Sequence, residues 1–285
     1  MCIVDYNRII GICRNNLNTS DNSCCIFKTF DNGMICASEQ SIVTETEIAE
    51  KVKEELKKQG GYFLTKEQSD KLSGFLLRAN GTMNPKIVGR TALKIAEMAG
   101  ITVPAGTKLL VSEQDPMNVS KKNPYSREKL CPVIAFFTVD GWEAACELSI
   151  RILQNEGAGH TMTLHTKNKD VVREFALRKP VSRILVNTPG ALGGVGASTG
   201  LAPALTLGCG AVGGSATPDN ITPMNLINIR RVAWGLCELE DLRKGSPVPK
   251  DEPACECGTR TDLTPEDIEA ITREIMKRLG AGLGK

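Results

Sequence analysis

The chain has 285 residues and a mass of 30.7 kDa, which is enough for one large domain or two domains of about 150 residues each. Hydrophobic residues make up 41% and charged residues 24%, a globular composition that excludes a collagen-like, coiled-coil or largely disordered protein. The net charge of +2 and an aromatic content of 4% argue against nucleic acids and anionic membranes as partners.

Neither membrane insertion nor export is indicated by the sequence. The longest apolar run, Cys131 to Phe137, is far shorter than the roughly 20 residues that span a bilayer. Asp5, Asn7 and Arg8 interrupt the region where a signal peptide would be apolar. The 11 cysteines are odd in number and lack framework spacing, which favours reduced thiols and a cytoplasmic location.

Apolar and amphipathic segments alternate between Ser41 and Asn187. The expected strands are Ser41 to Thr44, Lys108 to Ser112, Val133 to Val139, Thr161 to Leu164 and Arg183 to Asn187. The expected helices are Glu45 to Gln59, Thr91 to Met98, Trp142 to Leu153 and Lys169 to Leu177. This alternation predicts an α/β fold in which helices cover a parallel or mixed sheet.

The composition changes at Thr188. The following segment, up to residue 236, is dense in Gly and small residues and should be loop more than regular helix. Residues 237–260 have the Pro, Gly and charge content of a linker. Residues 261–280 predict an amphipathic tail helix, capped by Thr264 and carrying an apolar stripe of Leu263, Ile268, Ile271, Ile275 and Leu279. Such a stripe needs a partner surface, because an isolated helix of this length is marginal in water.

Cys36 is the first candidate for chemistry. It follows an Asp-Asn-Gly turn signal and precedes a strand, a position where a thiol can meet substrate near free backbone N–H groups. The spacing alone is also compatible with a buried cysteine that acts as a small hydrophobe.

Four motifs in the same order as in a known family strengthen the assignment of Cys36. The segment FDNGMICASEQ (Phe30 to Gln40) resembles the nucleophile motif of CoA-acylating aldehyde dehydrogenases, which include the acetaldehyde and propionaldehyde dehydrogenases of bacterial microcompartments. The segments REKLCPVIAFF, NEGAGHTMTLHT and ILVNTPGALGGVG with LAPALTLGCGAVGG agree in order. The resemblance extends over roughly residues 28–235 and implies a catalytic domain of the aldehyde dehydrogenase fold in residues 28–190, with three layers. Residues 191–236 would then be a glycine-rich active-site and interface segment.

The resemblance also implies a reaction. A Cys36 thiolate would add to an aldehyde, hydride would pass to NAD⁺, and CoA would take the acyl group from the resulting thioester. The backbone N–H of Cys36 would stabilise the oxyanion.

Glu128 and His160 complete the implied site. Glu128 lies in a Glu-x-Leu-x-Pro pattern similar to the family's element that binds the nicotinamide ribose; the alternative is a solvated charge beside Arg127 and Lys129. His160 lies in a Gly-x-Gly-His-Thr pattern and could assist the CoA thiol, hold cofactor or make a structural hydrogen bond. His165 is expected to be structural.

Two further patterns are not expected to bind ligands. Gly208 to Gly213 matches a dinucleotide-binding fingerprint, but Gly214, Pro218 and Pro223 would break the helix that a fingerprint opens. The resemblance implies that this loop lies near the aldehyde channel, so Cys209 is expected in the channel wall. Cys255 and Cys257, with Cys237, fall short of a closed zinc site, so no metal is expected, and the role of the pair stays open.

The resemblance does not extend to residues 1–27, which match nothing in the family and have no Rossmann pattern. We expect that the chain is an N-terminally truncated form, that it forms a homo-oligomer, and that the tail helix docks on a microcompartment shell protein. The alternative functions are a non-catalytic scaffold or cargo fragment, and acyl transfer without the redox step. Aldehyde chain length and the choice of NAD or NADP are not fixed by the sequence.

Overall fold

A computed structural model describes residues 2–4, 26–244 and 273 of the chain. The described residues divide into one unit within residues 1–227 and a second within residues 228–285. The first unit is built around a seven-stranded sheet whose paired strands all run parallel. The strands are β1 (Cys2–Val4), β2 (Ser41–Glu45), β3 (Gly61–Phe63), β4 (Leu109–Glu113), β5 (Val133–Val139), β6 (Gly159–His165) and β7 (Val181–Val186). Their order across the sheet is β3-β4-β5-β2-β1-β6-β7.

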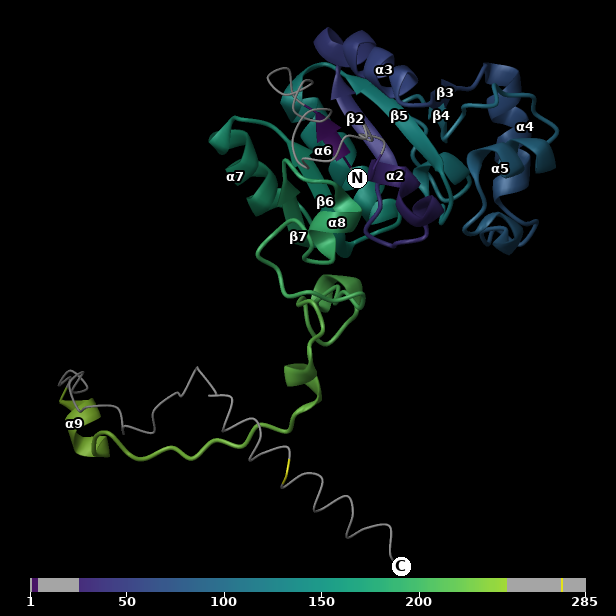
Figure 1. Cartoon of the computed structure of the whole chain (residues 1–285). Coiled ribbons are helices and arrows are strands. Elements are labelled where there is room, and N and C mark those ends of the chain that lie inside the picture. The colour runs from purple at the N-terminus through teal and green to yellow at the C-terminus, as the bar shows by residue number, and fades with distance from the viewer. Residues whose placement is uncertain (1, 5–25, 245–272, 274–285) are drawn as a thin grey trace, which may run out of the picture. The chain divides into compact units, whose positions relative to one another are not determined.

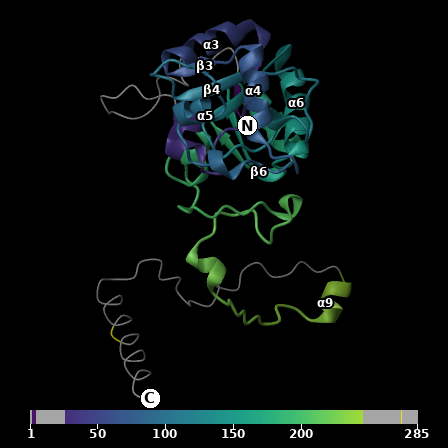
Figure 2. The ribbon, with the colours of Figure 1, turned by 90° about the vertical axis from the view of Figure 1, so that its right-hand side faces the viewer.

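Helices cover both faces of this sheet (Figures 1 and 2). They are α2 (Ile26–Thr29), α3 (Ala49–Lys58), α4 (Lys66–Leu76), α5 (Ala92–Met98), α6 (Gly141–Asn155), α7 (Lys169–Arg178) and α8 (Gly190–Gly194). Successive residues of β5 point to opposite faces, as strand geometry requires: Ala135 packs in the core under α4 to α7, and Phe136 in the core under α3. The predicted three-layer α/β fold is confirmed.

The predicted elements between residues 41 and 187 are all present, with ends that differ by a few residues. Helix α5 begins after Thr91 because the Thr91 hydroxyl accepts a hydrogen bond from the Lys94 N–H and so caps the helix. Helix α3 is shorter at its start than expected, since Thr46–Ile48 form a 3₁₀ turn.

Strand β3 and helix α4 were not predicted. The signal for α4 is a capping box: the Thr65 hydroxyl accepts from the Gln68 N–H, and the Gln68 side chain accepts from the Thr65 N–H. Strand β3 has three residues and offers no periodicity to detect.

The N-terminal segment differs most from expectation. No element was predicted within residues 1–27, which match nothing in the family, and Cys2–Val4 form strand β1 in the interior of the sheet. This strand pairs with β2 and with β6, so it joins the two halves of the sheet. Three residues carry too little pattern to reveal a strand, and the backbone ladder alone decides this placement.

The glycine-rich segment is mostly loop, as predicted, but its start is helical. Helix α8 forms at Gly190–Gly194 because its glycines allow a close approach that a side chain would prevent. A Cβ atom on Gly190 would lie 2.5 Å from the Ala37 carbonyl oxygen, next to Cys36. The helix therefore lies directly against the loop that carries Cys36.

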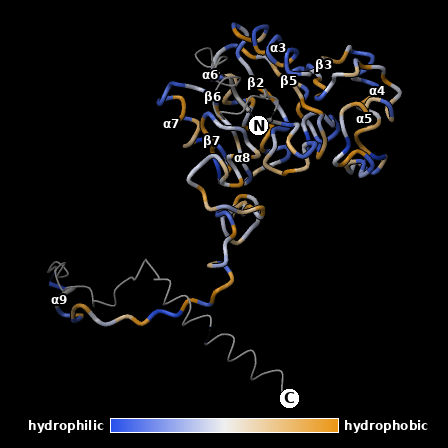
Figure 3. Tube along the Cα trace, viewed as in Figure 1, coloured by the Kyte–Doolittle hydropathy of each residue, from blue (hydrophilic) through white to orange (hydrophobic). Residues whose placement is uncertain are grey.

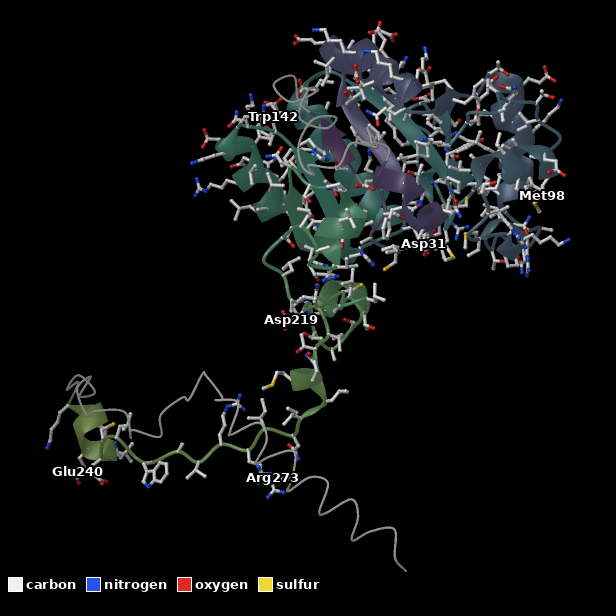
Figure 4. All side chains as sticks on the ribbon, in the orientation of Figure 1. Asp31, Met98, Trp142, Asp219, Glu240 and Arg273 are labelled. Atoms are coloured by element: carbon white, nitrogen blue, oxygen red, sulfur yellow. The ribbon has the colours of Figure 1, made fainter. Side chains whose placement is uncertain are left out.

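The second unit is described at residues 228–244 and at residue 273. Hydrophobic and hydrophilic residues alternate along its extended stretch (Figure 3), and exposed side chains include Val232 and Trp234. The short helix α9 (Leu239–Arg243) falls within the region expected to be a linker. No helix in the described part of the chain is both long and apolar enough to cross a bilayer. The predicted tail helix lies outside the described residues, apart from Arg273 (labelled in Figure 4).

Candidate active site

The Asp-Asn-Gly sequence before Cys36 makes a tight left-handed turn. Asp31, Asn32 and Gly33 have φ values of 48°, 50° and 72°, and the Asp31 side chain is exposed at the turn (Figure 4). A Cβ atom on Gly33 would lie 2.8 Å from the Lys28 carbonyl oxygen, so only glycine fits there. The turn leads to Cys36, which is exposed, five residues before β2. The interpretation of Cys36 as a buried hydrophobe is therefore wrong.

A single pocket brings together the three predicted site residues. Cys36 comes from the turn before β2, Glu128 from the loop before β5, and His160 from the start of β6. The pocket has a volume of about 160 Å³, and its other lining residues are Ser38, Gln40, Ser41, Ser126, Arg127, Ile152, Leu153, Glu156, Gly157 and Thr161. All three lie at or before the start of a strand, and parallel strands begin at the same edge of the sheet, which is why residues so distant in sequence meet.

The surroundings of Cys36 raise the pKa of its thiol. Partial desolvation in the pocket is the main cause, and the Glu128 carboxylate adds to it. The nearby backbone N–H groups of Ala37 and Cys36 act in the opposite direction and lower the pKa. Desolvation and the Glu128 carboxylate therefore both disfavour the thiolate form of Cys36. The same N–H groups are placed to stabilise negative charge beside the sulfur.

Glu128 is half-buried, not a freely solvated charge. Burial raises the pKa of its carboxyl, while Lys28 lowers it. Its backbone N–H donates to Glu156 Oε1 over 3.3 Å, and Glu156 in turn binds the Arg127 Nε at 2.5 Å. The Arg127–Glu156 ion pair therefore fixes the loop that presents Glu128 to the pocket.

His160 lies at the start of β6 in contact with its neighbour. Its Nδ1 is 3.0 Å from the Thr161 hydroxyl, and Arg183 Nε donates to that same hydroxyl over 3.2 Å. Desolvation, aided by the positive charge of Arg183, lowers the pKa of His160 to about 4. The imidazole is therefore neutral at physiological pH.

A buried carboxyl that the sequence analysis did not identify supports the Cys36 loop. Glu39 is fully buried, and its Oε1 accepts a 2.6 Å hydrogen bond from the Gly190 N–H at the start of α8. Lys28, also fully buried, contacts the Ser38 hydroxyl at 3.4 Å and the Gly33 carbonyl at 3.5 Å. Burial lowers the pKa of Lys28 to about 8 and raises that of Glu39. The sequence signal for this support was the charge of two residues near the motif: Glu39 within CASEQ and Lys28 before the turn.

Glu39→Gln should change how stability depends on pH. The folded pKa of Glu39 lies above its unfolded value, so its contribution is most favourable at low pH and is lost as pH rises through the folded pKa. The glutamine side chain of the variant would keep the carbonyl that accepts from Gly190 and would remove this loss. Urea unfolding should show the variant gaining stability relative to the natural protein between pH 5 and pH 8. If the free energies of unfolding of the variant and the natural protein differed by the same amount at pH 5 and at pH 8, the raised pKa of Glu39 would be contradicted.

Lys129 and Gln40 tie the Glu128 loop to the Cys36 loop. The Lys129 N–H donates to Gln40 Oε1 over 2.8 Å, and the Gln40 side chain donates to the Ser38 carbonyl over 3.3 Å. Lys129 Nζ donates to the carbonyls of Tyr125 and Arg127, and burial lowers its pKa to about 7. These bonds hold the two loops on either side of the pocket at a fixed distance.

The glycine-rich loop packs against the site without forming a dinucleotide-binding helix. Gly208 to Gly213 contain only a 3₁₀ turn at Ala211–Gly213, as the breaking residues predicted. The Arg183 guanidinium donates to the carbonyls of Gly208 and Pro218, anchoring the loop to β7. Cys209 is half-buried in this loop.

The remaining predicted residues lie away from the pocket or outside the described residues. His165 is buried at the end of β6 and is not among the pocket residues. Cys255 and Cys257 lie outside the described residues. Within residues 2–4, 26–244 and 273, no group of three or more His, Cys, Asp or Glu side chains could hold a metal ion.

Comparisons with known proteins agree with this geometry. No protein-family model matches the chain. Over 211 residues the chain is 40% identical to the bifunctional aldehyde-alcohol dehydrogenase AdhE of Escherichia coli. The match covers 72% of this chain and 23% of that protein. The crystal structure of an acetylating aldehyde dehydrogenase from Geobacillus thermoglucosidasius matches with 42% identity and a TM-score of 0.75 over 84% of the chain.

The chain belongs to the acylating aldehyde dehydrogenase family. A probable aldehyde dehydrogenase from Listeria monocytogenes has 59% identity and a TM-score of 0.72 over 76% of the chain. The chain spans 47% of that structure and 50% of the Geobacillus one, about half the length of each.

Proposed function

We propose that the chain carries the thiol chemistry of an acylating aldehyde dehydrogenase, which converts an aldehyde, NAD⁺ and CoA to acyl-CoA and NADH. The observation that carries the proposal is the meeting of Cys36, Glu128 and His160 in one pocket. Three segments far apart in the sequence supply a nucleophile, a carboxylate and an imidazole to a small cavity, and Cys36 is exposed there.

The nucleophilic step falls to Cys36. Its thiolate adds to the aldehyde carbon and gives a thiohemiacetal, and loss of hydride from that carbon leaves a thioester on the sulfur. The CoA thiolate then attacks the thioester carbon, acyl-CoA forms, and the Cys36 thiolate is released. The backbone N–H groups of Ala37 and Cys36, which favour negative charge on the sulfur, would stabilise the charge that develops beside it in both addition steps.

Glu128 is the proposed contact for the nucleotide. NAD⁺, when bound, supplies the acceptor for the hydride. A half-buried carboxylate in the same pocket as the nucleophile fits the hydroxyls of a ribose, because carboxylate oxygens accept hydrogen bonds from such groups. His160 is proposed to act on the acyl-transfer half of the reaction, where a neutral imidazole can contact the thioester or CoA.

The reverse reaction provides the test. The purified chain is given acetyl-CoA and NADH, and NADH absorbance is followed; oxidation that requires both compounds would support the proposal. If NADH is not consumed and no acetyl group appears on the protein by intact mass, the proposal is refuted. An acetyl group without NADH oxidation would restrict the chain to acyl transfer and would refute the redox half.

We further propose that the protein works in the cytoplasm as a homo-oligomer inside a bacterial microcompartment, with the tail at residues 261–280 docked on a shell protein. The apolar stripe in the tail sequence supports this, and the fold also occurs in a propionaldehyde dehydrogenase of a fucose-utilisation microcompartment. A shell protein should co-purify with the full chain and be lost on deletion of residues 259–285. Retention after the deletion would refute docking through the tail, and size-exclusion chromatography with light scattering tests the oligomer.

A further inference from the structure

The hydroxyl of Thr161 connects His160 to a buried arginine. Thr161 is 7% exposed and Arg183 is 5% exposed, so their hydrogen bond is shielded from water. Arg183 can only donate hydrogen bonds, and its Nε–H donates one to Thr161 Oγ1 over 3.2 Å. The same Thr161 oxygen lies 3.0 Å from His160 Nδ1. One oxygen atom thus contacts both the cation and the ring.

The chemistry of these groups decides the direction of the second bond. The Thr161 oxygen already accepts from Arg183, and its own proton still needs an acceptor. No acceptor for this proton other than His160 Nδ1 is found among the residues that the structure describes. If Nδ1 instead carried the ring proton, two donors would point at one oxygen and the hydroxyl proton would be unpaired in a buried site. The arrangement that satisfies all three groups has Thr161 donating to Nδ1.

We propose that Thr161 and Arg183 are positioning residues that hold His160 in the Nε2–H form, so that His160 serves the proposed acyl transfer as a neutral hydrogen-bond donor and not as a general base. In this form Nε2 already carries its proton and Nδ1 is engaged. The ring can therefore donate to the acyl oxygen or to the CoA sulfur, but it cannot take the CoA thiol proton at Nε2. This inference rests on the proposed function of the pocket.

The position of Arg183 is itself fixed by the fold. Its Nη1 donates over 2.8 Å to the carbonyls of both Gly208 and Pro218, and its Nη2 donates over 2.6 Å to Gly208. The guanidinium therefore cannot turn away from Thr161 without breaking its bonds to the glycine-rich loop. A lysine would keep the positive charge but lacks the planar set of donors that makes these bonds together.

The state of the ring can be read directly, because the chain has only two histidines. Two-bond ¹H–¹⁵N spectra of the full chain labelled at histidine should show His160 with a protonated Nε2 and an unprotonated Nδ1 at pH 7. His160→Gln identifies its signals against those of His165. Protonated Nδ1, or a mixture of both forms, in the natural protein would overturn the proposal. No substrate is needed, so this result is independent of whether Cys36 becomes acylated.

Substitution of Thr161 separates positioning from mere packing. Thr161→Val should shift His160 to a mixture of tautomers and slow acetyl transfer between Cys36 and CoA about tenfold, a loss of about 1.4 kcal/mol of transition-state stabilisation. Thr161→Ser keeps the hydroxyl and should restore both the tautomer and the rate. Thr163→Val makes the same change two residues along β6 and should alter neither. An unchanged tautomer in Thr161→Val would overturn the proposal.

The pH profile gives a further readout that a structural role would not move. If His160 donates, the rate of acetyl transfer should rise with pH as the CoA thiol ionises, without levelling off near the usual histidine pKa. A rate that is already flat from about pH 5, above the lowered pKa of His160, and that becomes dependent on pH in Thr161→Val would mean that His160 is a base. If Cys36 of the natural protein is never acylated, the proposed function fails and the catalytic part of this inference fails with it, whatever the spectra show.

Discussion

Cys36→Ala is expected to lower acetyl-CoA-dependent NADH oxidation by about 10⁴-fold or more, because removal of a covalent nucleophile leaves only binding and electrostatic effects. The side chain is exposed in the pocket, and the turn that precedes it depends on Gly33 and not on the thiol, so the alanine variant should fold normally. The measurement is the initial rate of NADH oxidation, with circular dichroism as the check on folding.

A matched change of another cysteine controls for general thiol effects. Cys237 lies in the second unit and is not a pocket residue, so Cys237→Ser should leave the rate within about twofold, as for most substitutions away from structural features. If Cys36→Ala retained most of the activity while folded, Cys36 would not be the nucleophile, and the pocket would have to act through another group.

Gly159→Ala should destabilise the protein by about 3 kcal/mol or more, the range of the severe effects of single substitutions. Gly159 has φ of +82°, and a Cβ atom there would lie 2.3 Å from the Cys209 carbonyl and 2.5 Å from the Gly213 backbone. Because these contacts are all with backbone, no side-chain rotation can relieve them, and the glycine-rich loop must move away from β6. Urea unfolding measures the loss of stability.

Gly214→Ala separates the two causes of this effect. Gly214 also has a left-handed backbone, with φ of +73°, but nothing lies within 4 Å of a Cβ atom added there. Gly214→Ala should therefore lower the free energy of unfolding by only about 1 kcal/mol, the cost of the strained backbone. Equal losses of stability in the two variants would show that the close approach of the loop to Gly159 is not what the glycine permits.

Most of the sheet could be predicted from the sequence because hydrophobic periodicity is a strong local signal. The apolar run Val133 to Val139 and the amphipathic helix after it are found where the pattern places them. Strand β1 has three residues whose position is set by ladders to β2 and β6, which no local pattern contains. The helical start of the glycine-rich segment depends on contacts with Ala37 and Glu39, residues far away in sequence.

The candidate site, like the sheet, could be predicted only in part. The motifs pointed to Cys36, Glu128 and His160, and the fold brings all three to one pocket. Their supports are less visible in sequence: Glu39, Lys28 and Arg183 are charged residues that a linear pattern assigns to the surface, whereas the structure buries them. The raised pKa of Cys36 could not be predicted from the turn before it, since it results from desolvation in the pocket and from Glu128.

Peptide mapping by mass spectrometry after incubation with acetyl-CoA tests the central claim most directly. We predict one acetyl group, on the peptide that contains Cys36, which disappears on addition of free CoA because the thioester is returned to the carrier. Acetylation that is absent from Cys36, or that is spread equally over the other cysteines, would contradict the account.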